Sequence, residues 1–389
     1  MSVRLQFTGD ILCQIQQNDA CRTETGYDYS PVLRDIRHHL ADCDYLVGNL
    51  ETPFAGKEMG YSDRLYQFNT PDEFLTMLKD SGFHMFSTAN NHCMDRGTAG
   101  LDRTLNKLDD MGFAHTGTFR TLEERNTPLI EEIGGIRFGF ISYTYGTNAF
   151  FHHMYLPEDR KWSVNLLQPE EGKEGAIDLL DEARITENVE RLYRNPNFQF
   201  DTIIKPYLDQ LAADIRDTRS AGAEYVILLL HCGGQHNLMP DAYTHWIAEY
   251  AARSGADMII GNHQHILHPY VHIGHTRVAY CLGNLTDTPD SNPNGRGIGE
   301  EYSILLRVDF AKRNDAIAVE QVSFVPVKSV FDERNRAVVR DVESLIRNSR
   351  NDNEKEMLLK DLTHFVNLVS GTNSENIPVR SFYLLEQDE

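Results

Sequence analysis

Apolar runs and amphipathic segments alternate along the first part of the chain. Three segments have the apolar content of strands and end in polar residues: Val3–Phe7, Asp44–Val47 and His84–Thr88. Segments with apolar residues at helical spacing lie between and after these runs, and helices are therefore predicted at Pro31–Leu40, Pro71–Ser81 and Leu101–Met111. Each of the last two helices is followed by a glycine, which is typical of a helix end.

The pattern changes after Gly112. A hairpin is predicted over residues 128–143, with Gly134 and Gly135 at its turn. Residues 225–230 are all apolar, which is typical of a strand covered on both faces. The remaining elements are predicted as helices at 201–220 and 240–254 and strands at 256–260, 277–281, 302–310 and 317–327.

Strands that alternate with helices predict an α/β fold. Residues 1–330 are predicted to form the main domain. Within it, residues 146–200 are polar and lack a clear period, so we interpret them as an insertion or lid. Residues 331–389 are charged and mostly helical in pattern, and we expect this C-terminal extension to pack on the main domain.

Charge and composition narrow the possible partners and location. The 389 residues carry a net charge of −21, with 58 acidic and 37 basic side chains, which argues against nucleic-acid binding. Residues 1–10 resemble a strand rather than a signal peptide, and no apolar run approaches the roughly 20 residues of a membrane span. The six cysteines form no Cys-x-x-Cys pair. These features predict a cytoplasmic protein with reduced thiols and no membrane segment.

Polar side chains gather where the predicted strands end. The clearest example is His263-Gln264-His265, which follows an apolar strand and a glycine. In open α/β sheets, ligands bind beyond the carboxyl ends of the strands. The other residues at such ends are Asp10, Asn49, Glu51, Asn91, His92 and His231.

Each of these residues also has a simpler explanation. Asp10 could be a turn residue, Asn91 could cap a helix, and His231 could be a hydrogen-bonded core histidine. Their repetition at five strand ends favours a metal centre instead. Carboxylate, amide and imidazole ligands together suit Zn, Mn or Fe better than Ca or Mg, so one or two divalent transition metal ions are predicted.

Six motifs in a fixed order also resemble a known family. They are Gly9-Asp10, Gly48-Asn49-Leu50-Glu51, Asn90-Asn91-His92-Cys93-Met94-Asp95-Arg96-Gly97, His231-Cys232-Gly233, Gly261-Asn262-His263-Gln264-His265 and Leu282-Gly283-Asn284. This set resembles the bacterial capsule synthesis protein CapA family of the poly-γ-glutamate biosynthesis type. The resemblance implies a branch of the calcineurin-like metallophosphatases, with a four-layer αββα sandwich of two mixed sheets and a dinuclear metal centre.

The resemblance also implies roles for individual residues. It makes Asp10 and His265 ligands of one metal. It makes Asn91, His231 and His263 ligands of the other. The bridging position falls to Glu51 or Asn49, and His92, oriented by Asp95, would aid the leaving group.

The chain departs from the family pattern at three places. Leu12 stands where a metallophosphatase has a histidine, and Asn49 stands where it has the bridging aspartate. Gln235 replaces the glutamate that often follows the family's His-Trp-Gly motif. The missing histidine predicts that the metal bound by His265 is the weaker of the two.

Two functions from different classes follow. The first is a metal-dependent hydrolase that acts on a phosphoester or related anionic substrate through a metal-activated water. The alternative is a non-catalytic accessory protein of capsule or poly-γ-glutamate synthesis with a vestigial metal site. The expected partner is a small anionic substrate or polyanion precursor. Arg160 and Lys161 in the insertion are candidates to contact its anionic group, although a solvated loop is the simpler explanation for them.

Overall fold

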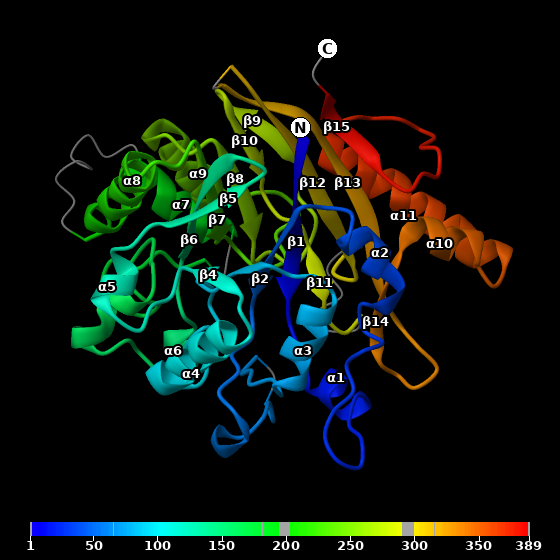
Figure 1. Cartoon of the computed structure of the whole chain (residues 1–389), viewed down its shortest axis with the longest axis horizontal. Coiled ribbons are helices and arrows are strands. Elements are labelled where there is room, and N and C mark those ends of the chain that lie inside the picture. Colours follow the sequence, from blue (N-terminus) through cyan, green and yellow to red (C-terminus); the bar gives the residue numbers. More distant parts are fainter. Residues whose placement is uncertain are drawn as a thin grey trace.

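Two β-sheets packed face to face form the centre of the molecule, and helices cover their outer faces (Figure 1). The computed structural model describes residues 2–64, 66–179, 182–193, 203–289, 299–314 and 316–387. Among the helices in these ranges, none is long and apolar enough to cross a membrane. The order of layers is helix, sheet, sheet, helix, which confirms the predicted αββα sandwich with two mixed sheets.

The first sheet has nine strands within the described residues, in the order β14-β13-β12-β1-β2-β3-β4, with β11 paired to β1 and β15 to β13. Strands β1 to β4 are parallel, whereas β12 is antiparallel to β1. Their bounds are β1 (Ser2–Ile11), β2 (Tyr45–Leu50), β3 (Met85–Ser87), β4 (Ala114–Thr116), β11 (Asn284–Thr286), β12 (Tyr302–Arg313), β13 (Ala316–Phe331), β14 (Ala337–Asp341) and β15 (Tyr383–Gln387).

The second sheet has six strands in the described ranges, ordered β5-β6-β7-β8-β10-β9. Strands β6, β7, β8 and β10 are parallel, and the edge strands β5 and β9 are antiparallel to their neighbours. Their bounds are β5 (Leu129–Ile133), β6 (Ile136–Thr144), β7 (Tyr225–His231), β8 (Met258–Asn262), β9 (Tyr270–Ile273) and β10 (Thr276–Ala279). Strand β7 is buried along its whole length, as its apolar run predicts.

Helices lie on both outer faces and at the C-terminal side of the molecule (Figure 1). The α-helices are α1 (Ile15–Ala20), α2 (Arg37–Leu40), α3 (Glu73–Asp80), α4 (Gly97–Asp110), α5 (Leu122–Arg125), α6 (Ala149–His152), α7 (Glu182–Tyr193), α8 (Lys205–Ser220), α9 (Ala242–Ser254), α10 (Val342–Arg347) and α11 (Asp352–Ser370). Short 3₁₀ turns are η1 (Arg34–Ile36), η2 (Lys57–Met59) and η3 (Glu158–Ser163).

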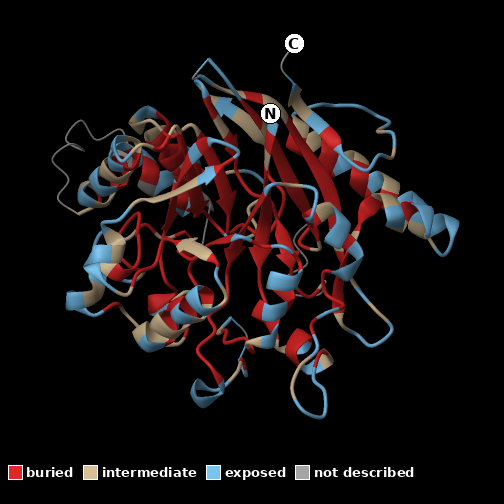
Figure 2. Ribbon diagram, in the orientation of Figure 1, coloured by how far each residue is buried: buried red, intermediate tan, exposed pale blue. Residues whose placement is uncertain are grey.

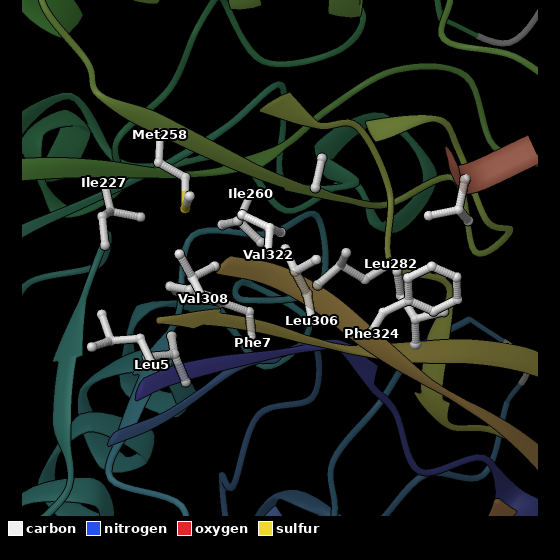
Figure 3. Packing of buried hydrophobic residues seen from close by; sticks show 14 of the residues in the cluster. Leu5, Phe7, Ile227, Met258, Ile260, Leu282, Leu306, Val308, Val322 and Phe324 are labelled. Carbon is white, nitrogen blue, oxygen red and sulfur yellow. The ribbon is translucent and has the colours of Figure 1, made fainter. Parts of the chain in front are cut away.

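Apolar side chains fill three layers between these elements. In the central layer, Leu5 and Leu306 of the first sheet face Ile227 and Ile260 of the second (Figure 3). The other two layers lie between the first sheet and α3 and α4, and between the second sheet and α8 and α9. Buried residues accordingly follow both sheets, while exposed residues follow the outer sides of the helices (Figure 2). Each large apolar side chain buried in this way contributes about 1.5–3 kcal/mol to stability.

The predicted helix at residues 31–40 is shorter in the structure. Only η1 and the four-residue α2 are helical there, because the carbonyl of Val32 accepts from the backbone N–H of Val339, at 2.8 Å, instead of closing a helical turn. The expected domain boundary at residue 330 lies within β13, and β14 and β15 of the C-terminal extension pair with that strand. Of the insertion at 146–200, residues 180, 181 and 194–200 lie outside the described ranges.

Helix α11 is held to the first sheet by its buried face. Leu362, 1% exposed, belongs to the same apolar cluster as Phe324 of β13, and Met357 on the same helix is 51% exposed. We expect Leu362→Ala to lower the free energy of unfolding by about 2–5 kcal/mol, because it leaves a cavity. Met357→Ala should change it by no more than about 0.5 kcal/mol. Chemical denaturation measures both, and equal effects would contradict this docking.

Candidate metal centre

The carboxyl ends of strands from both sheets meet at one place. In the first sheet, Asp10 of β1 pairs in register with Asn49 of β2 and with Asn284 of β11. In the second sheet, His231 of β7 pairs with Asn262 of β8, and His263 follows directly. The residues predicted at the strand ends are therefore brought together, and all of them are buried.

Two groups of donor atoms at this junction share one carboxylate. Glu51, His231 and His263 each offer a ligand atom within 4.8 Å of the others, and so do Asp10, Glu51 and His265. Glu51 lies just after β2 and belongs to both groups. A carboxylate common to two such donor groups would allow two divalent cations to be held at neighbouring positions.

Asp10 is fixed by bonds to both of its oxygens. Asn49 donates to Oδ1 through its amide nitrogen at 2.7 Å, and the backbone N–H of His263 donates to Oδ2 at 3.0 Å. His265 Nδ1 lies 3.3 Å from Oδ2. Burial opposes ionisation of Asp10, but the hydrogen bond to His265 and the nearby imidazole charges outweigh it and lower the pKa of this carboxyl.

His231 contacts Asn91, Glu51 and Asn49, which come from three different places in the first sheet and its loops. Its Nε2 is 2.8 Å from Asn91 Oδ1 and 3.4 Å from Glu51 Oε1, and its Nδ1 is 3.1 Å from the amide nitrogen of Asn49. Burial lowers the pKa of His231 to about 3. The imidazole is therefore neutral at physiological pH, which is the form that binds metals.

Both side-chain oxygens of Glu51 are buried, and neither has a hydrogen-bond partner within the described residues. Burial, followed by the negative charge of Asp10, raises the pKa of Glu51 well above its ordinary value. A buried carboxylate without donors is unfavourable unless a cation or proton compensates it. The residues present therefore fit a bound divalent metal.

The backbone at His263 and His265 adopts a conformation that few non-glycine residues accept. Their φ angles are 102° and 63°, and each such residue costs about 1–3 kcal/mol. Gly261 precedes them in β8, and a Cβ there would lie 2.0 Å from the carbonyl oxygen of Tyr280. Burial, followed by repulsion from neighbouring imidazoles, lowers the pKa of His263 well below its ordinary value.

His92 and Asp95 form a hydrogen-bonded pair beside these donor groups. His92 Nδ1 lies 2.7 Å from Asp95 Oδ2, which also accepts from the backbone N–H of Phe68 at 2.6 Å. The Phe68 ring packs on the imidazole with centroids 4.3 Å apart. Within the described part of the chain no hydrogen bond uses His92 Nε2, so this nitrogen is available to a bound molecule.

The insertion adds two polar residues to the site that the sequence did not indicate. Asn148 accepts from the amide of Asn91 at 3.2 Å, and His152 Nε2 lies 3.5 Å from Asp95 Oδ1. Glu171 holds this segment by accepting backbone N–H bonds from residues 147, 148 and 149. No sequence motif marks these residues, because their position depends on how the insertion folds back against the segment that follows β3.

Polar residues also lie near His265. Asn284 Oδ1 lies 2.8 Å from His265 Nδ1, and Gln235 Nε2 lies 3.4 Å from His265 Nε2. His236 Nδ1 lies 2.7 Å from a carboxylate oxygen of Glu300. Asn284 belongs to a motif visible in the sequence, whereas the His236–Glu300 pair depends on tertiary structure.

Arg160 and Lys161, the candidates for contact with an anionic group, are paired elsewhere. Arg160 lies 2.7 Å from Asp102, and Lys161 lies 2.6 Å from Glu158. Lys161 also lines a separate cavity of about 340 Å³ beside Trp162, and no metal-ligand candidate lines that cavity. The structure does not bring these two cations to the donor groups.

Curated proteins with capsule-related names match most of this chain. The capsule biosynthesis protein CapA of Bacillus anthracis is 21% identical over 345 residues, which are 86% of this chain and 72% of that protein. The PGA biosynthesis protein CapA of Bacillus subtilis (strain 168) is 23% identical over 243 residues, which are 62% of this chain and 52% of that protein.

Among solved structures, the calcineurin-like phosphoesterase YfkN from Bacillus subtilis has a TM-score of 0.48 at 13% identity, covering 94% of this chain and 98% of that one. A family profile described as bacterial capsule synthesis protein PGA_cap matches residues 4–288, which include every ligand candidate. The chain belongs to this bacterial capsule synthesis protein family.

Proposed function

We propose that this protein is a metal-dependent hydrolase of the metallophosphatase type that acts on a phosphoester or a related anionic substrate. The observation that carries the proposal is the pair of donor groups that share the buried Glu51. The names of its relatives refer to capsule and PGA biosynthesis, which supports an anionic substrate or the precursor of an anionic polymer.

The donor set suits Mn, Zn or Fe. One ion would be held by Glu51, His231 and His263, with the Asn91 amide oxygen adjacent. The other would be held by Asp10, Glu51 and His265. We assign the bridging position to Glu51, because Asn49 directs its amide nitrogen at Asp10 and His231 and so positions these two. When bound, such ions lower the pKa of water and stabilise negative charge on a phosphoryl group.

His92 is the proposed proton donor to the leaving group. Asp95 binds Nδ1 of the imidazole, which fixes the ring and leaves Nε2 for the substrate. A proton on Nε2 can then pass to the departing oxygen. The packing of Phe68 on the ring excludes water from one face of His92.

The metal content of the purified protein tests the ligand assignment. We expect wild-type protein to hold one or two transition metal ions per chain at this centre, and His263→Gly to bind metal there at least about 10-fold more weakly. Glycine accepts the backbone conformation of His263 without strain. His153→Gly, at an exposed histidine that also has a positive φ, is the matched control. Elemental analysis that finds no stoichiometric metal in wild type would overturn the proposal.

Glu51→Gln should stabilise the metal-free protein and, at the same time, reduce the stabilisation that added metal provides. In metal-depleted protein, Glu51→Gln should raise the free energy of unfolding by about 1–3 kcal/mol, because a buried carboxylate without donors is removed. Saturating Mn²⁺ at 100 times its Kd should stabilise wild type by about 2.7 kcal/mol but the variant by much less. Denaturation with and without metal measures both effects.

Glu171→Gln is the control for this comparison. Its carboxylate is partly buried and accepts several backbone N–H bonds, so the substitution should destabilise the protein. If Mn²⁺ stabilises Glu51→Gln as much as wild type, Glu51 is not a shared ligand.

An assay of phosphoester hydrolysis distinguishes the hydrolase function from the non-catalytic accessory function. Metal-loaded protein should hydrolyse bis(p-nitrophenyl) phosphate or p-nitrophenyl phosphate. His92→Ala should lower kcat by about 10²–10⁴-fold without loss of metal. His275→Ala, at an exposed histidine, should leave kcat unchanged. Stoichiometric metal without turnover on a wider panel of phosphoesters would instead favour the non-catalytic accessory role.

A further inference from the structure

A second group of metal-ligating side chains lies on the side of the molecule that faces away from α8 and α9, where α2 approaches the end of β14 (Figure 1). His38 and His39 are consecutive in α2, and their ring centroids are 4.0 Å apart. One nitrogen of each ring and one carboxylate oxygen of Asp341 lie within 4.8 Å of one another. These three residues share no member with the centre at Glu51.

Independent contacts hold the three side chains at this spacing. The backbone N–H of Val339 donates to the carbonyl of Val32 at 2.8 Å, which ties β14 to the segment before α2. Arg340 donates to Asp35 at 3.0 Å. The carbonyl of His39 accepts from Arg307 at 3.0 Å. The backbone on both sides is thus positioned without any contribution from the two imidazoles or the Asp341 carboxylate.

The donor atoms themselves are free to bind a ligand. Across the described ranges, neither imidazole takes part in a side-chain hydrogen bond. Asp341 Oδ1 accepts from the backbone N–H of Ser344 at 2.8 Å and caps α10, but Oδ2 makes no hydrogen bond with the described residues. Two adjacent imidazoles without side-chain hydrogen bonds, beside a carboxylate oxygen, are a combination that a cation would stabilise.

We propose that His38, His39 and Asp341 bind a divalent transition metal ion, with zinc the best match. Two imidazole nitrogens and one carboxylate oxygen are ligands that zinc accepts, and three protein ligands leave one position open. Ligands around a tetrahedral zinc ion are about 3.4 Å apart, so these side chains need only small rotations to close on it. His38 is exposed and can rotate without disturbing the core.

The open position of this ion would face a large groove. His38 and Asp341 both line a cavity of about 1060 Å³, which is also lined by Lys328, Arg340 and Arg350. The bound ion would join residues that lie about 300 positions apart in the chain, and would therefore tie α2 to the start of α10.

Zinc binding by the full-length protein tests this site separately from the centre at Glu51. Protein stripped with a chelator is dialysed against zinc, and bound zinc is measured over a range of free concentrations. We expect Glu51→Gln to keep one zinc ion. Adding His38→Ala or His39→Ala to this background should weaken its binding at least 10-fold, whereas adding His275→Ala should not.

Asp341→Asn tests whether weaker zinc binding results from the loss of a ligand or from a change in folding. Asparagine also caps helices, so this variant retains the cap of α10 while it removes the carboxylate, and its zinc affinity should fall as well. Two outcomes would overturn the proposal: Glu51→Gln protein that binds no stoichiometric zinc, or histidine variants that bind zinc as tightly as His275→Ala. This site does not rest on the proposed hydrolase, because loss of turnover or of metal at Glu51 leaves the zinc measurement unchanged.

Discussion

The charge of Glu51 is the constraint around which the site is built. Its carboxylate is buried beside Asp10, and neither oxygen has a hydrogen-bond partner among the described residues. The neighbouring His231 and His263 cannot balance it as cations, because burial lowers the pKa of both imidazoles. A bound divalent cation would relieve this cost and would use the same neutral imidazoles as ligands.

The two-sheet architecture explains how so many donors reach one point. Parallel strands of each sheet end at the same edge, and the two edges face each other across the central apolar layer. The close approach needs a glycine at Gly261 and positive φ angles at His263 and His265. Conformational strain at these positions lowers the stability of the fold, which is common where a site requires a fixed geometry.

Some residues around the centre belong to segments outside the two sheets. Glu171 anchors the insertion so that Asn148 and His152 reach Asn91 and Asp95. At the other end of the molecule, β14, β15 and α11 extend the first sheet and its apolar layer. The C-terminal residues are thus part of the sheet that carries several of the metal-ligand candidates. Asp341, at the end of β14, lies beside His38 and His39.

The sequence by itself determined the class of fold and most of the metal-ligand candidates, because strand periodicity locates strand ends and parallel strand ends converge. It could not choose between Asn49 and Glu51, since both follow the same strand and only the direction of the Asn49 amide separates them. Only the tertiary structure shows that Asn148 and His152 lie against Asn91 and Asp95, and that His38 and His39 lie beside Asp341. These positions arise from contacts between segments far apart in the chain, which local periodicity does not encode. Burial likewise decides the charge of Glu51, and burial is a property of the folded chain.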